Sequence, residues 1–332
     1  MKKIKTMRAA GALLVATLLS TSAVSGTYAK YVSEGSAGDT ARVAKWGIVI
    51  AASGNLFSSS YLDADDNTPA SATEAATSIS VKSYNDDAVV APGTKSDQGM
   101  YFNISGTPEV DYQLSGSIEG KDVYLAAGTY ALMVPVKVDA STFATLKDTL
   151  YTGTAGTSYT KLTDGAVFDS DTAYFQLNTV ATVSDDYYPV VFSGVSSKKT
   201  AKEIVAVWAE KFGSDAIALD DDNDTGSVKY VFDDEYVYKN NTPISADLKA
   251  QTLSWEWAFS LDEPTDMMDT ILGDLAALYQ EDATFTTDIV SVGDDGVTIL
   301  TVDSNGLVKE GNGEVGCVVE TLNIDLTATQ VD

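Results

Sequence analysis

The sequence predicts a mainly β protein, a jelly-roll or β-sandwich with short helices inserted between its strands. Three observations indicate this class. Short stretches that alternate apolar and polar residues recur along the chain, and turn-forming residues separate them at short spacing. Few segments carry apolar residues at helical spacing. Apolar residues make up 44% of the 332-residue chain, enough to form a folded core and too many for a disordered chain.

The N-terminus has the three parts of a secretory signal. Basic Met1–Arg8 precedes an apolar run, Ala9–Leu19, and a small, polar stretch that ends at Ala29. The apolar run is too short to span a bilayer comfortably. We expect cleavage between Ala29 and Lys30, with Ala23 as the alternative position, and no membrane contact after cleavage.

Residues 30–332 are expected to form a single decorated β-sandwich domain that is released or held non-covalently. Its expected strands include Arg42–Ala52, Ile79–Tyr84, Met100–Gly106, Val110–Glu119, Leu132–Val138, Thr252–Phe259 and Cys317–Val331. Pro135 indicates an edge strand or a bulge, because proline cannot donate to a sheet ladder. The last stretch reads as one long strand with a slip in its alternation. Two Asn-Gly pairs, Asn305-Gly306 and Asn312-Gly313, are typical of hairpin turns.

Helices interrupt this pattern at three places. Ser141–Leu150 carries spaced apolar residues and predicts a short helix. Thr200 and Glu203 form a capping-box pattern that opens a helix ending at Phe212. Asp262–Tyr279 reads as a loop that runs into a helix.

Composition excludes several classes of function. The chain has 21 basic and 48 acidic residues, and loss of the four basic residues in the signal leaves 17 basic residues against 48 acidic ones. Nucleic acid and anionic lipid are bound through clustered Lys and Arg, so we expect neither as a partner. There is no histidine, which removes imidazole catalysis and histidine-ligated zinc. The single cysteine, Cys317, lies in an apolar stretch and is expected to be buried.

Removal of the signal at Ala29 would leave the first strand at a free chain end. A strand in that position can pair outside its own domain, so Lys30–Ala52 is a candidate donor strand. The residues that would fill a neighbour's groove are Tyr31, Val32, Val43, Trp46, Ile48 and Ile50. The alternative is an ordinary first strand paired within its own sheet.

An acidic stretch is the best metal candidate. Asp221, Asn223 and Thr225 place oxygen ligands at alternate positions before Gly226, as in the first half of a calcium-binding EF-hand loop. The twelfth position of that loop is Phe232 where calcium sites carry Glu. A solvated acidic loop is therefore the alternative, and calcium is the one cofactor considered.

Two further patterns suggest sugar binding and glycoside cleavage, and each has a simpler structural explanation. Trp255 and Trp257 flank Glu256, but on a strand the carboxylate points away from both rings, which favours two core tryptophans. Glu109 and Asp111 share strand parity and would suit a glycosidase pair at the right separation. With 48 acidic residues, chance pairs are expected, and we expect no enzyme.

Several stretches together resemble the TasA/camelysin family of exported, biofilm-fibre-type proteins. They are Ala41–Gly47 beside the SipW-type signal region, Ala91–Thr94, Phe102–Val110, Trp255–Phe259 and Asp269–Gly273. The resemblance implies a jelly roll whose freed N-terminal strand completes the sheet of the next subunit. Camelysin-like members are classed as metallopeptidases, an activity not carried over because this chain lacks histidine.

The sequence therefore predicts a secreted structural protein of a Gram-positive bacterium that self-assembles into extracellular or biofilm-matrix fibres. Its expected partners are further copies of itself, a signal peptidase and other matrix proteins. The alternative is a monomeric cell-surface adhesin or carbohydrate-binding module, and a glycosidase-like hydrolase ranks third.

Overall fold

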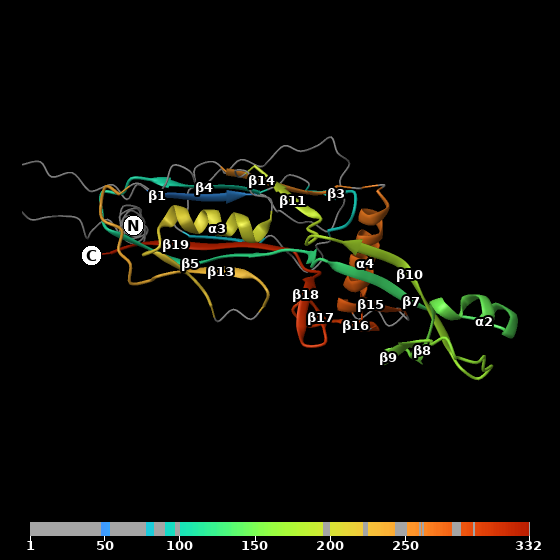
Figure 1. Ribbon diagram of the computed structural model, residues 1–332. Coiled ribbons are helices and arrows are strands. Elements are labelled where there is room, and N and C mark those ends of the chain that lie inside the picture. Colours follow the sequence, from blue (N-terminus) through green and yellow to red (C-terminus); the bar gives the residue numbers. More distant parts are fainter. Residues whose placement is uncertain are drawn as a thin grey trace, which may run out of the picture.

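The computed structural model describes residues 48–53, 78–82, 90–96, 100–194, 200–221, 225–242, 251–258, 260, 262–280, 287–294 and 296–331. Within these ranges the chain forms three antiparallel sheets and three α-helices, which confirms the mainly β class with inserted helices. Figure 1 shows an elongated molecule, with two five-stranded sheets towards one end and a nine-stranded sheet towards the other.

The two five-stranded sheets make up the sandwich. The first contains, in order, β1 (Ile48–Ser53), β4 (Met100–Gly106), β14 (Gln251–Trp257) and β11 (Val190–Ser193), with β3 (Thr94–Lys95) paired to β14. The second contains, in order, β12 (Ile217–Leu219), β13 (Val228–Phe232), β5 (Tyr112–Lys121), β19 (Thr321–Gln330) and β2 (Ser78–Lys82). Side chains of both sheets share one hydrophobic core, as alternation on one face of each strand requires.

The nine-stranded sheet was not predicted from the sequence. Its strands, in order, are β6 (Tyr124–Leu125), β18 (Gly313–Cys317), β17 (Leu307–Glu310), β16 (Gly296–Val302), β15 (Asp288–Gly293), β7 (Gly128–Val136), β10 (Tyr174–Val183), β8 (Leu150–Thr154) and β9 (Ser158–Lys161). Two stretches of chain supply these strands, one between β5 and β11 and the other between β14 and β19.

Helix α3 (Ala201–Phe212) begins where the capping-box pattern predicts. The Thr200 hydroxyl accepts from the Glu203 backbone N–H at 3.1 Å, and Glu203 Oε2 accepts from the Thr200 N–H at 3.3 Å. The buried side chains of α3 belong to the same core as both sandwich sheets. Figure 1 draws α3 alongside β5, β13 and β19.

The other two helices differ from expectation at their ends. Helix α2 (Ala140–Leu146) is capped by Asp139 and stops before the predicted end, because a 3₁₀ turn and β8 follow it directly. Helix α4 (Glu263–Tyr279) begins at once, without the predicted loop, and Pro264 lies in its first turn, where its missing N–H is not needed. Among the described residues, no helix is both long and apolar enough to cross a membrane.

The prediction of one long strand over Cys317–Val331 is wrong. The chain leaves the nine-stranded sheet at Cys317 and enters the second sandwich sheet at Thr321. The slip in the alternation marks this change of sheet, because each segment follows its own inward face. Glu320, at the junction, is 5% exposed.

Two local predictions are refined by the pairing. Pro135 lies in β7, an interior strand, but among the described residues β15 pairs with β7 only as far as Met133, so the described β15 ladder needs no N–H from Pro135. The turn from β16 to β17 is centred on Ser304-Asn305, one residue earlier than the predicted Asn305-Gly306, and the Gly306 N–H closes it on the Asp303 carbonyl with Gly306 at φ +77°. The second turn lies one residue earlier than predicted, at Gly311-Asn312, since β18 already begins at Gly313.

Candidate functional site

The part of the proposed donor strand that the structure describes is an edge strand of the sandwich. β1 pairs antiparallel with β4 along all six of its residues, from Ile48 opposite Gly106 to Ser53 opposite Tyr101. Ile50 lies opposite Ile104 in this register, and Ile48 is 6% exposed. Within the described ranges, β4 is the one strand that pairs with β1. This is the within-sheet pairing that the sequence left as the alternative.

The rest of the predicted assembly and cleavage residues lie outside the described residues. They are Ala29, Lys30, Tyr31, Val32, Val43 and Trp46. The described structure therefore places only the C-terminal end of the candidate donor, where the chain runs into the sandwich (Figure 1).

The calcium candidate is only partly described. Asp221 is exposed, and Asn223 lies outside the described residues. The Thr225 hydroxyl is 2.8 Å from that of Ser227, which donates to Glu119 Oε1 at 2.6 Å. These contacts turn Thr225 towards β5. No group of three or more metal-binding side chains occurs in the described part of the chain.

Trp255 and Trp257 are core residues, as the strand alternation predicts. Each tryptophan residue is 4% exposed, while Glu256 between them is exposed. Trp257 Nε1 donates to Asp269 Oδ1 at 3.0 Å, and the Tyr187 hydroxyl donates to the same oxygen at 2.6 Å. Burial raises the pKa of Asp269, and the two hydrogen bonds partly offset this effect. The arrangement joins α4 to β14 and leaves neither ring on the surface for a sugar.

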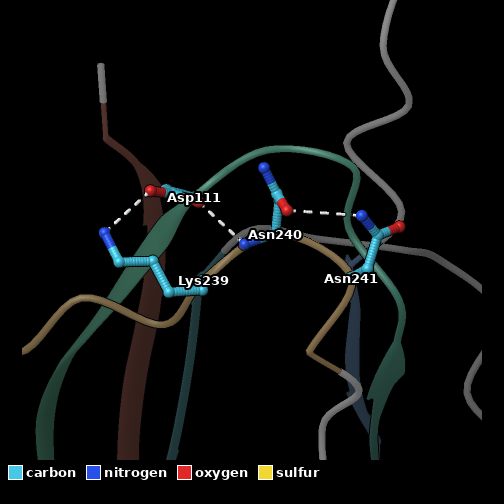
Figure 2. A network of polar contacts seen from close by, with 4 residues as sticks. All are labelled: Asp111, Lys239, Asn240 and Asn241. Atoms are coloured by element: carbon cyan, nitrogen blue, oxygen red, sulfur yellow. Dashed lines mark hydrogen bonds and ion pairs between the residues drawn. The ribbon is translucent and has the colours of Figure 1, made fainter.

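Asp111, suggested as one member of a carboxylate pair with Glu109, makes hydrogen bonds to the segment after β13. Figure 2 shows its two oxygens divided between Lys239 Nζ at 3.1 Å and the Asn240 backbone N–H at 2.7 Å. The Asn240 hydrogen bond, followed by that from Lys239, lowers the pKa of Asp111. Asn241, in the left-handed region at φ +61°, donates its N–H to the Pro108 carbonyl. The network thus fastens the segment after β13 to the start of β5.

A buried carboxyl pair at the other end of β5 was not predicted. Asp122 and Glu320 are 3% and 5% exposed. Asp122 accepts from the backbone N–H groups of Ala201 at 2.6 Å and Lys202 at 3.3 Å, the first two residues of α3. Glu320 Oε2 accepts from the Val123 N–H at 2.7 Å. The pair connects the ends of two sheets to the start of a helix.

The two carboxyl groups have different hydrogen-bonding surroundings. Burial raises the pKa of both, and the α3 N–H groups offset part of the effect on Asp122 only. The Glu320 carboxyl interacts with that of Asp122, an interaction that lowers the pKa of Asp122 and raises that of Glu320. Glu320 Oε1 nevertheless lacks a hydrogen bond of normal geometry to any described residue.

A surface pocket of about 380 Å³ lies beside this pair. Its lining comprises Asp122, Tyr188, Val190, Val191, Thr200, Lys202 and Glu203. The Tyr188 ring stacks on Tyr124 at 5.5 Å between centroids, and Lys202 Nζ lies 5.4 Å from the Tyr124 ring. The α3 N–H groups that could bind an anion here are already taken by Asp122 and Thr200.

Comparison of the chain with protein-family models, with curated proteins and with solved structures finds no match.

Proposed function

We propose that this is an exported structural protein whose processed copies assemble into extracellular or biofilm-matrix fibres by exchanging the N-terminal strand. The observation that carries the proposal is the position of β1. It is the first described strand, it lies at a sheet edge, and its pairing within the described structure is with β4 alone. An edge strand can leave without breaking any sheet in two.

Strand exchange replaces the β1–β4 pairing within one chain with the same pairing between two chains. The six-residue register of β1 on β4 can form equally with β1 of a second copy, because the two strands are identical. If each copy gives β1 to the next and receives one from the previous copy, the contact is head-to-tail. Such a contact does not close on itself and builds a filament.

Chain length does not prevent this exchange. Residues 54–77 connect β1 to β2 and number 24. A fully extended chain spans at most about 3.3–3.6 Å per residue, which gives roughly 80 Å of reach. That distance is several times the width of a five-stranded sheet, whose strands lie about 4.8 Å apart.

The sequence supports an extracellular setting for this assembly. The secretory signal places the new chain end shortly before β1, and the resemblance to the TasA/camelysin family implies strand donation. The surplus of acidic residues favours solubility before assembly and opposes partners that carry phosphate. The partners proposed here are other copies of the chain, the signal peptidase and other matrix proteins.

Disulfide trapping distinguishes exchange from pairing within one chain. Ala51 and Asn103 are opposite each other in the β1–β4 register. In a background lacking the native thiol (Cys317→Ala), Ala51→Cys and Asn103→Cys are introduced into separate batches of processed protein that carry tags of different mass. The batches are mixed under assembly conditions and oxidised.

A disulfide between the two tagged chains is expected, together with filaments by negative-stain microscopy. The matched control replaces Ser115 and Thr327, which are opposite each other in the interior β5–β19 pair. These substitutions should cross-link when placed in one chain and not between two batches. Deletion of residues 30–53, which removes the whole candidate donor including β1, should leave soluble monomers. Filaments without the 51–103 cross-link would reject exchange of β1, and monodisperse particles would favour the monomeric adhesin or carbohydrate-binding module.

A further inference from the structure

The Asp122–Glu320 pair lies at a junction of three segments. Asp122 directly follows β5 and accepts from the first two N–H groups of α3. Glu320 separates β18 from β19 and accepts from the N–H of Val123. Two side chains therefore fasten the start of the helix to the point where the chain changes sheets.

Such a buried pair cannot hold two charges without strong repulsion, so one proton must be shared between the groups. Asp122 keeps the charge, because two N–H donors at a helix N-terminus stabilise its ionised form. Glu320 keeps the proton, because it receives one N–H bond and its Oε1 has no well-formed partner among the described residues. A proton on Oε1 turns that oxygen into a donor towards Asp122.

The other charged and titratable groups near the pair do not replace this proton. Lys202 and Glu203 lie in the first turn of α3, Tyr188 precedes β11, and Cys317 ends β18. Lys202 offsets part of the effect of burial on both carboxyl groups. Lys121 affects Cys317 and donates to the Asn305 carbonyl.

We propose that the Asp122–Glu320 pair is a proton-dependent latch. With its proton, Glu320 holds Asp122 against the start of α3; when the proton leaves, the two like charges separate and the start of α3 detaches from the β18–β19 junction. The opening would widen the pocket between α3 and β11. The proposal does not depend on fibre assembly, and either can fail alone.

Composition makes this latch unusually easy to observe. The chain has no histidine, the group that ordinarily titrates near neutral pH. Burial raises the pKa of Cys317 to about 11, and the tyrosines with resolved shifts are moved upwards from 10. Between the ordinary carboxyl range and about pH 9, below the ordinary range of lysine and tyrosine, the groups expected to titrate are the chain's amino terminus and carboxyls whose pKa burial raises, such as Asp269 and Asp274.

The sign of the effect follows from the raised pKa of Glu320. The folded chain holds the proton at pH values where the unfolded chain has already released it. The stabilisation is fully present below the ordinary Glu pKa and is lost as pH rises through the folded pKa. Within that window the folding equilibrium constant falls by up to tenfold per pH unit, the limit for one proton.

The test compares the wild-type processed protein with Glu320→Gln. Urea unfolding is measured from pH 5 to pH 9, and amide hydrogen exchange at Ala201 and Lys202 is compared between the two proteins at each pH. The glutamine keeps the shape and has no proton to lose. Glu314→Gln, at an exposed carboxyl nearby, is the matched control.

The wild type and the control should lose stability, and protection at the start of α3, as pH rises through the window. Glu320→Gln should change much less. Parallel pH curves for all three proteins would overturn the latch, as would pH-dependent exchange that leaves the start of α3 unaffected. A measurement without a variant adds a second test: wild-type protein near pH 6 should show the infrared carbonyl band of a buried protonated carboxyl. Absence of that band would also overturn the proposal.

Discussion

Replacing Asp269 tests how the first sandwich sheet is held to α4. The carboxylate accepts from the Tyr187 hydroxyl at 2.6 Å and from Trp257 Nε1 at 3.0 Å, both on the same oxygen. Asp269→Ala removes that acceptor and leaves both donors without this partner. Trp257 is 4% exposed, so water cannot easily take the place of the carboxylate.

The expected loss in the free energy of unfolding is about 2–4 kcal/mol. A hydrogen bond to a charged group contributes about 1.5–3 kcal/mol, and two are lost. The sum is reduced because the folded protein no longer has to bury an ionised carboxylate, a cost shown by the raised pKa of Asp269. Asp269→Asn retains an acceptor of the same shape, so its loss should stay within about 1 kcal/mol.

Urea unfolding at neutral pH, followed by tryptophan fluorescence, measures both changes. Asp266→Asn, an exposed residue on the same helix, controls for charge on α4 and should change stability by only a few tenths of a kcal/mol. An alanine variant as stable as the wild type would refute the reasoning. So would alanine and asparagine variants with equal losses, since the argument depends on the acceptor atom.

Three further predictions concern local structure. Thr200→Ala should lower the free energy of unfolding by about 1 kcal/mol through loss of the α3 capping box, whereas Thr200→Ser should retain it, as measured by urea unfolding. Gly306→Ala should lower the free energy of unfolding by about 1–2 kcal/mol because its φ is +77°, and by more because the new Cβ would lie 2.3 Å from Val319 Cγ2. Gly156→Ala, at φ +72° with no atom near the new Cβ, measures the backbone cost alone. Equal losses of unfolding free energy in the two variants would contradict the predicted clash with Val319. Cys317 should resist maleimide at neutral pH in the folded protein and react in urea, because it is 0% exposed and its pKa is raised to about 11; rapid labelling of folded protein would disprove this.

Features encoded by near neighbours could be predicted from the sequence. The start of α3 depends on Thr200 and Glu203, three residues apart, and the pattern identified both ends of that helix. The burial of Trp255 and Trp257 follows from strand alternation, which is also local. The turn at Asn305 was predictable to within one residue because Gly306 takes a positive φ that suits glycine.

Features that join distant segments could not be predicted in the same way. The nine-stranded sheet pairs β7 with both β10 and β15, strands from different stretches of chain, and alternation does not state which strands pair. The change of sheet between Cys317 and Thr321 left a trace in the alternation, but the slip alone does not reveal two sheets. The polar acceptors Asp111 and Asp269 carry no signal of their distant donors either.

The carboxyl pair shows how such distant contacts bear on function. Asp122 and Glu320 would each read as one more charge among 48 acidic residues, yet both are almost fully buried at one junction. β1 and this junction belong to different sheets of the same sandwich, and β1 pairs with β4 without any contribution from Asp122 or Glu320. Strand exchange should therefore proceed in Glu320→Gln, while the pH response of α3 should weaken. If fibre formation and the pH response were lost together in that variant, the edge and the latch would have to be one device, and the separation argued from the sheet topology would be wrong.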